Sequence, residues 1–174
     1  MEGRKRILYR AVTTALTVAM MFLIFSFSTE PAEKSDRTSW FVSRKIIRVL
    51  YPDIQKKTGE ERITIYNTVQ HAVRKAAHFT EYMILGLLIR LCLESWFGTR
   101  RWSIPVAWLI GTLYAGTDEL HQLLIDGRSG QWSDVLLDSA GVLTGVMIAA
   151  AVILAVYRKR QEREYGVLPE QPAE

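Results

Sequence analysis

Residues 142–157 read V-L-T-G-V-M-I-A-A-A-V-I-L-A-V-Y, and Thr144 is the only strongly polar side chain among them. A helix that is apolar on every face is buried in a large core or in a membrane, because a surface helix of a small soluble bundle needs a polar face. Residues 13–27 carry no charge and are also apolar on every face. We therefore predict a membrane protein, although the mean hydropathy of +0.06 resembles that of a soluble chain.

Four segments approach the ~20 residues that a helix needs to cross the apolar core of a bilayer. They lie at about 11–27, 77–97, 104–125 and 134–157. The last three carry ionisable residues, and a long polar stretch separates the first from the second. The predicted fold class is all-α, an integral membrane four-helix bundle with a long external loop that contains an interfacial helix. The predicted domain covers residues 1–165, and residues 166–174 form a disordered tail.

The first span is predicted to remain in the protein, because its apolar core exceeds the roughly 7–15 residues of a signal peptide. Ser26 and Ser28 offer small residues in the arrangement of a cleavage site, so removal of this span stays as the alternative.

Positive charges predict the orientation, because the cytoplasmic flanks of membrane spans carry an excess of Lys and Arg. With both termini cytoplasmic, ten basic residues of the flanks and of one short turn lie on that side: Arg4, Lys5, Arg6, Arg10, Arg100, Arg101, Arg158, Lys159, Arg160 and Arg163. The long loop between the first two spans carries many basic residues as well, which weakens the predicted orientation but does not reverse it.

The long loop contains W-F-V-S-R-K-I-I-R-V-L-Y at residues 40–51, which mixes apolar and basic residues with helical spacing. This pattern predicts a helix that lies on the membrane surface or caps the bundle. Pro52 should end it, because the residue before a proline avoids the helical region. Residues 58–61 are interpreted as a turn, and a helix is expected to restart at about Thr64 and to continue into the second span.

Consecutive spans run in opposite directions, so their polar residues meet at one depth, which we place on the extracytoplasmic side. These residues are Lys75, His78, Glu81, Tyr82, Asp118, Glu119, His121, Gln122, Asp134 and Asp138, and Arg128 joins them from the turn before the fourth span. An ionisable side chain at mid-bilayer costs roughly 2.5–3.5 kcal/mol on insertion scales, so these groups should face a protein interior. They form either a structural ion-pair network or a network that also handles a ligand or a proton.

Spacing within the helices supports a shared face. Two sets of residues recur at i, i+4, i+7 and i+11: Gly111, Ala115, Asp118 and Gln122 in one span, and Asp134, Asp138, Gly141 and Gly145 in the next. At ~100° per residue, each set falls within about 60° of arc. The two glycines of the second set form a G-x-x-x-G motif, which lets a neighbouring helix approach closely.

Other classes of site find little support. The single cysteine, Cys92, excludes an internal disulfide and a cysteine-based zinc site. No motif of basic and aromatic residues accompanies the net charge of +4, so we expect no nucleic-acid partner. We predict no cofactor and no metal.

Four motifs in order resemble the VanZ-like membrane proteins. They are K-A-A-H-F-T-E-Y-M-I-L-G (75–86), D-E-L-H-Q (118–122), G-R-S-G (127–130) and D-V-L-L-D-S-A-G-V-L-T-G (134–145). The resemblance implies a multi-pass protein of the bacterial cytoplasmic membrane. In the best-known member it implies lowered susceptibility to teicoplanin, without a settled reaction. The family-like positions are the eleven polar residues selected above.

Two functions follow as hypotheses. In the first, the polar residues bind an amphiphile such as a lipid-linked cell-wall precursor or a lipoglycopeptide; Lys75 and Arg128 engage its phosphate or carboxylate, while Tyr82 and Gln122 orient it. The alternative is a membrane-embedded hydrolase or transferase that acts on a lipid-linked substrate. Its catalytic candidates are His78 or His121 as general base and Glu81 or Glu119 as the orienting acid, with a metal-assisted variant.

Overall fold

The computed structural model describes residues 2–30, 32–125 and 131–165, and within them every regular element is a helix. In chain order the elements are α1 (Glu2–Ser28), α2 (Ala32–Leu50), the short 3-10 helix η1 (Ile54–Lys56), α3 (Gly59–Phe97), α4 (Ser103–Gln122) and α5 (Trp132–Tyr165). The prediction of an all-α fold is confirmed. Both Arg128 and the predicted tail, residues 166–174, lie outside the described residues.

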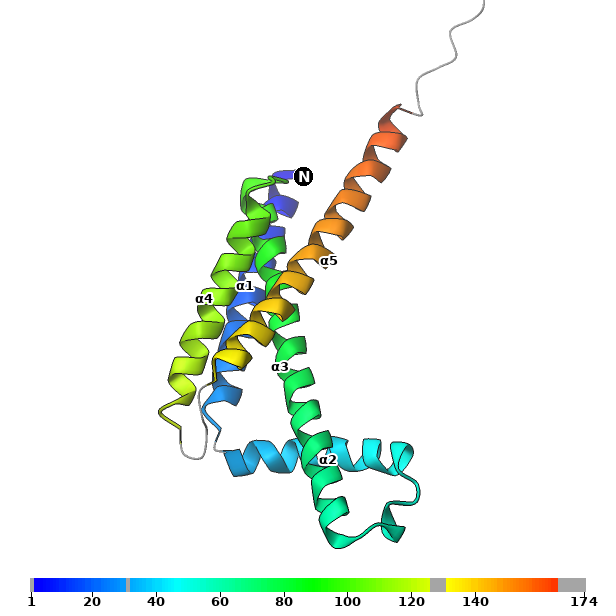
Figure 1. Ribbon diagram of the computed structural model, residues 1–174. Coiled ribbons are helices and arrows are strands. Elements are labelled where there is room, and N and C mark those ends of the chain that lie inside the picture. Colours follow the sequence, from blue (N-terminus) through cyan, green and yellow to red (C-terminus); the bar gives the residue numbers. More distant parts are fainter. Residues whose placement is uncertain (1, 31, 126–130, 166–174) are drawn as a thin grey trace, which may run out of the picture.

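Helix α3 organises the molecule. It is 39 residues long and contacts each of the other four α-helices. Helices α1 and α4 run beside its second half, α2 crosses near its first half, and α5 crosses its middle and then diverges (Figure 1). The beginning of α1 and the end of α5 therefore lie at one end of the bundle, and α2 lies at the other.

Three helices are long and apolar enough to cross a membrane: Gly3–Ser28 in α1, Gly59–Phe97 in α3 and Trp132–Arg163 in α5. Helix α4 has 20 residues but does not join them, because the polar residues of its last turns lower its mean hydropathy. It packs against both α3 and α5. That α4 is the fourth span of a four-helix bundle stays a prediction.

The loop between the first two predicted spans is more helical than the sequence indicated. The predicted surface helix is present as α2 and ends at Leu50, before Pro52, but it begins at Ala32. The predicted turn at residues 58–61 is wrong. There Thr58 caps α3, because its side chain accepts a hydrogen bond from the backbone N–H of Glu61 while the Glu61 carboxylate accepts one from the N–H of Thr58. This capping box starts α3 five residues before the predicted Thr64.

The core forms where α5 crosses α3. A Cβ atom on Gly145 would collide with the carbonyl oxygen of Met83, and one on Gly141 would lie 2.5 Å from that of Phe79. On the facing helix, a Cβ on Gly86 would lie 2.8 Å from the Cα of Val142. The two backbones are therefore in direct contact, as the G-x-x-x-G motif predicted.

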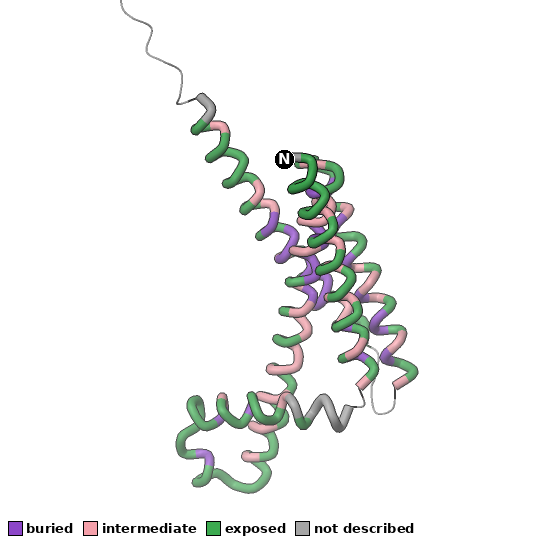
Figure 2. Tube along the Cα trace, turned by 180° about the vertical axis from the view of Figure 1, so that it is seen from behind, coloured by how far each residue is buried: buried purple, intermediate pink, exposed green. Residues whose placement is uncertain are grey.

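Around this crossing the bundle is thin and its outer surface is apolar. Figure 2 shows buried segments in the middle of the bundle, while the described part of α2 is mostly exposed. Large apolar side chains such as Phe22, Leu113 and Leu136 are more than half exposed. Exposed apolar side chains in such number are typical of a protein whose surroundings are lipid.

The crossing predicts opposite effects for two identical substitutions. Gly145→Ala should destabilise the folded state by about 1–3 kcal/mol, because the added methyl group forces α3 and α5 apart. Gly116→Ala on α4 meets no atom within 4 Å and should stabilise by up to ~1 kcal/mol through helix propensity. Unfolding of the purified variants in mixed micelles measures both effects. Equal stability of the two variants would contradict close backbone contact at Gly145.

Candidate functional site

Three helices bring polar side chains to the end of the bundle at which α4 is followed by α5 (Figure 1). We call the following residues the polar cluster: Lys75, His78, Glu81 and Tyr82 on α3, Asp118, Glu119, His121 and Gln122 on α4, and Asp134 and Asp138 on α5. All of them were selected from the sequence. The structure shows which of these residues interact. It also shows that some of them, such as Glu119 and His121, lie on different faces of one helix.

Tyr82 lies at the centre of the polar cluster and is completely buried. The carboxyl groups that act on its hydroxyl electrostatically are those of Asp118 and Asp138, so α3, α4 and α5 converge on it. Its ring lies 6.4 Å from that of Tyr114, whose hydroxyl donates a 2.6 Å hydrogen bond to the carbonyl oxygen of Met21. The hydroxyl of Tyr82 itself meets hydrogen-bond geometry with no described residue. The carboxyl group of Asp118 is the closest to a hydrogen-bond partner that this hydroxyl has among the described residues.

Buried carboxyl groups surround this tyrosine. Asp138 is only 2% exposed, and the acidic groups that act on it electrostatically are Asp118, Asp134, Glu119 and Glu81. One carboxylate oxygen of Asp138 and one of Asp118 have no hydrogen-bond partner among the described residues. Burying several like charges is costly unless a proton or a positively charged group is shared among them. The arrangement can therefore hold a proton, an amino group or a hydrogen-bond donor.

The two carboxylates on α4 accept hydrogen bonds from defined donors. Asp118 accepts a 3.1 Å hydrogen bond from the side-chain amide of Gln122, four residues later on the same helix. Glu119 accepts a 2.6 Å hydrogen bond from the backbone N–H of Gln131, just before α5. The first bond fixes a carboxylate toward the core, and the second ties the end of α4 to the start of α5.

Lys75 forms an ion pair with Asp134, as expected if carboxylates hold the cation in place. The two side chains are 26% and 31% exposed, so the pair lies at the rim of the polar cluster. Ser133 also donates a 3.1 Å hydrogen bond to the same carboxylate. The ammonium group of Lys75 is thus already engaged, which reduces its capacity to neutralise an anionic ligand.

The two catalytic candidates on α4 point in different directions. His121 stacks on Phe25 of α1, with ring centroids 4.8 Å apart, whereas Glu119 bonds to the residue that precedes α5. Positions 119 and 121 lie about 160° apart around a helix, so Glu119 does not orient His121 as a base. His78 and Glu81 are half-buried on α3 and both take part in interactions. Within residues 2–30, 32–125 and 131–165, no three His, Cys, Asp or Glu side chains are placed to hold a metal ion.

An apolar groove adjoins the polar cluster, and the sequence analysis did not predict it. Its volume is about 330 Å³, and Leu113 and Leu120 of α4 line it together with Leu123, which follows α4, and Trp132 of α5. Gly116 opens the groove, because a glycine among these leucines leaves space on the helix surface. Glu119 also lines it, so the groove leads to a buried carboxylate.

A small hydrogen-bond network joins α4 to α5 below the groove and was also missed. The hydroxyl of Ser139 lies 2.8 Å from that of Thr112 and accepts a 3.0 Å hydrogen bond from the indole N–H of Trp108. The only signal in the sequence is the four-residue spacing of Trp108 and Thr112, which puts both on one face of α4. This network holds α4 against α5 and so supports one wall of the groove.

The ion pair at the rim predicts measurable coupling. Lys75→Met, Asp134→Asn and the double variant should show a coupling energy of roughly 0.5–3 kcal/mol for unfolding in mixed micelles. The matched control is the pair Lys56–Asp53, whose side chains are 80% and 72% exposed and which should couple by less than ~1 kcal/mol. Coupling between Lys75 and Asp134 no larger than in this control would show that the rim pair does not hold the helices together.

Comparison with known proteins agrees with the motifs. The family model described as VanZ/LLP1 matches residues 13–155, a range that includes every residue of the polar cluster. No match is found among curated proteins or among solved structures. Because the match covers most of the chain, and because three of its helices are long and apolar enough to cross a membrane, this protein belongs to the VanZ-like family of membrane proteins.

Proposed function

We propose that this VanZ-like protein binds an amphiphilic ligand of the bacterial envelope between the polar cluster and the apolar groove. The observation that carries the proposal is the position of Glu119, which is buried in the polar cluster and also lines the groove. A ligand with an acyl chain and a polar head group matches this combination, because binding sites pair apolar walls with a few convergent polar groups.

The negative charge of the polar cluster determines which kind of ligand head group it can bind. The polar cluster contains five acidic residues, Glu81, Asp118, Glu119, Asp134 and Asp138, and Lys75 is already paired with one of them. A bare phosphate would meet net negative charge here. An amine or a group rich in hydroxyl and amide donors would meet acceptors, including the carboxylate oxygens of Asp118 and Asp138 that have no described partner. The expectation that Lys75 receives a phosphate or carboxylate is modified, because Lys75 is paired with Asp134. Arg128 lies outside the described residues, so its part in that expectation stays a prediction.

In the proposed orientation, the polar cluster is extracytoplasmic and both termini are cytoplasmic, in the cytoplasmic membrane of a bacterium. Support comes from the two ends of the bundle. The beginning of α1 and the end of α5 lie at the same end of the bundle, and both carry Lys and Arg, as cytoplasmic flanks do (Figure 1). The polar cluster lies at the opposite end, where it would reach lipid-linked cell-wall precursors or a lipoglycopeptide such as teicoplanin.

We favour binding over the form of the enzymatic alternative that pairs His121 with Glu119. A hydrolase that used His121 and Glu119 as a base and its orienting acid would need them side by side, but they lie on different faces of α4. The buried groups that do converge are Tyr82, Asp118 and Asp138, which suit proton sharing and hydrogen bonding to a head group.

The proposal predicts protection that depends on both parts of the site. Expression in a teicoplanin-sensitive host should raise the inhibitory concentration of teicoplanin and leave that of vancomycin, which lacks an acyl chain, unchanged. Asp118→Asn should abolish the effect because the head group loses a charged acceptor, and Gly116→Leu should abolish it by filling the groove. Binding of a fluorescent acylated glycopeptide to the purified variants should weaken by roughly tenfold or more.

Matched control variants distinguish loss of the binding site from a general loss of folding or expression. Asp53→Asn removes an exposed carboxylate, and Ala151→Leu adds the same leucine to a membrane-facing position of α5; both should behave as wild type. Membrane levels of all variants are equalised by immunoblot. No protection by well-expressed wild-type protein would refute the link to teicoplanin, and equal probe binding by wild type, Asp118→Asn and Gly116→Leu would refute the site.

A further inference from the structure

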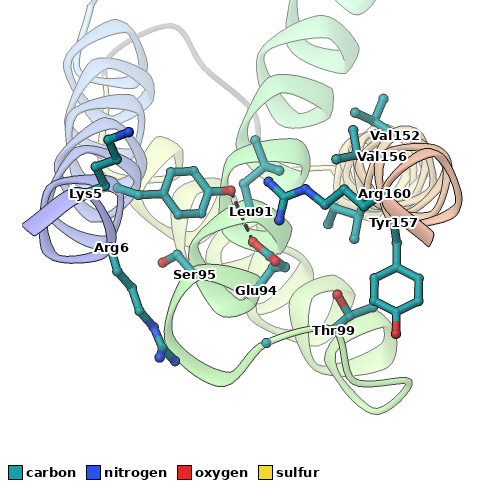
Figure 3. Close-up of a pocket in the computed structure, with 13 residues that line it drawn as sticks. Lys5, Arg6, Leu91, Glu94, Ser95, Thr99, Val152, Val156, Tyr157 and Arg160 are labelled. Atoms are coloured by element: carbon teal, nitrogen blue, oxygen red, sulfur yellow. Dashed lines mark hydrogen bonds between the residues drawn. The ribbon is translucent and has the colours of Figure 1, made fainter. Parts of the chain in front are cut away.

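A second cleft lies at the opposite end of the bundle, near the chain termini. There α5 diverges from α1 and α3 and leaves a space of about 640 Å³ (Figures 1 and 3). This volume lies within the ~300–1,000 Å³ of typical small-molecule sites. The cleft is far from the polar cluster along α3 and shares none of its residues.

The walls of the cleft change from apolar to basic along the helix axes. Leu91 of α3 and Val152 and Val156 of α5 line the part nearer the middle of the bundle. Lys5 and Arg160 lie nearer the helix ends, and Arg160 is about 12 Å further along α5 than Val152. A membrane-facing cleft graded in this way matches a lipid, with an acyl chain along the apolar wall and a head group at the basic rim.

Positive charge dominates the rim. Lys5, Arg6 and Arg160 line the cleft, and Figure 3 shows the guanidinium of Arg160 extending from α5 across it. Among the described lining residues the one acidic side chain is Glu94, which already accepts a 3.2 Å hydrogen bond from the hydroxyl of Tyr9. The lining therefore carries net positive charge, which attracts an anionic head group.

A further cation lies beneath this rim. Arg90, one turn before Glu94 on α3, is 2% exposed, and its Nε and Nη1 atoms have no hydrogen-bond partner within the described ranges. Two residues that line the cleft act on the Arg90 guanidinium electrostatically. They are the carboxylate of Glu94 and the phenol of Tyr9. Arg90 is buried and adds positive potential behind the cleft.

We propose that this cleft binds one anionic glycerophospholipid from the leaflet beside the chain termini. Its phosphate lies between Arg160 of α5 and the basic residues at the start of α1, and one acyl chain lies along Leu91, Val152 and Val156. The bound lipid thereby closes the space between α5 and α1. A second copy of the chain is a poorer occupant, because it would bring the same basic residues against this rim.

Lipid binding by the purified full-length protein tests the proposal. Native mass spectrometry measures the occupancy of added dioleoylphosphatidylglycerol and of dioleoylphosphatidylcholine in detergent. The wild type should bind one phosphatidylglycerol in clear preference to phosphatidylcholine. Arg160→Gln should weaken this binding about fivefold, since one basic residue near a membrane surface contributes about that factor. Val156→Trp should abolish it by filling the apolar part of the cleft.

Two variants on the same helix serve as controls. Arg158→Gln removes one charge two residues away, outside the lining, and Leu154→Trp places the same side chain at an equally exposed position, 48% against 49% for Val156. Both should retain the wild-type preference. Equal loss in Arg158→Gln and Arg160→Gln would overturn the proposal in favour of diffuse charge attraction. A dimer that excludes lipid and dissociates in Val156→Trp would overturn it in favour of a second copy.

Discussion

The close contact between α3 and α5 is the constraint on which the rest of the structure depends. Glycines at 86, 141 and 145 remove the side chains that would separate the two backbones. In a bilayer, apolar burial contributes little to helix association, so packing at such contacts must hold the helices together. This contact therefore fixes where α3 and α5 cross. On one side of the crossing α5 meets α4 at the polar cluster, and on the other side it diverges and leaves the basic cleft.

The polar cluster depends on this crossing as well as on its own hydrogen bonds. Asp138 lies one turn before Gly141 on α5, and Tyr82 lies one turn before Gly86 on α3. The contact that brings the glycines together therefore also brings these two polar side chains together, with Asp118 from α4. A buried group of carboxylates is tolerable only where geometry is fixed and donors are supplied. An apolar groove adjoins this site at Glu119.

The spacing of residues along each helix predicted which side chains share a face, but not which neighbouring helix each face meets. Gly111, Ala115, Asp118 and Gln122 are all buried, as their shared stripe indicated. The stacking of His121 on Phe25 could not be predicted, because spacing within one helix does not say which neighbour each flank meets. The groove depends on the missing side chain of Gly116, and an open space leaves no pattern in a sequence. The early start of α3 was visible as Thr58 and Glu61, a capping box that the turn interpretation overlooked.

Photocrosslinking in living cells tests the central claim, a specific amphiphile in the groove, most directly. A benzoylphenylalanine residue replaces either Leu120, which lines the groove, or Leu109, which faces outward on the same helix with similar exposure, 62% against 55%. Mass spectrometry then identifies what each position captures. The account predicts a discrete acylated molecule with an amine-bearing or donor-rich head group at position 120, and only bulk phospholipid at position 109. The same mixture of bulk phospholipids at both positions would contradict it.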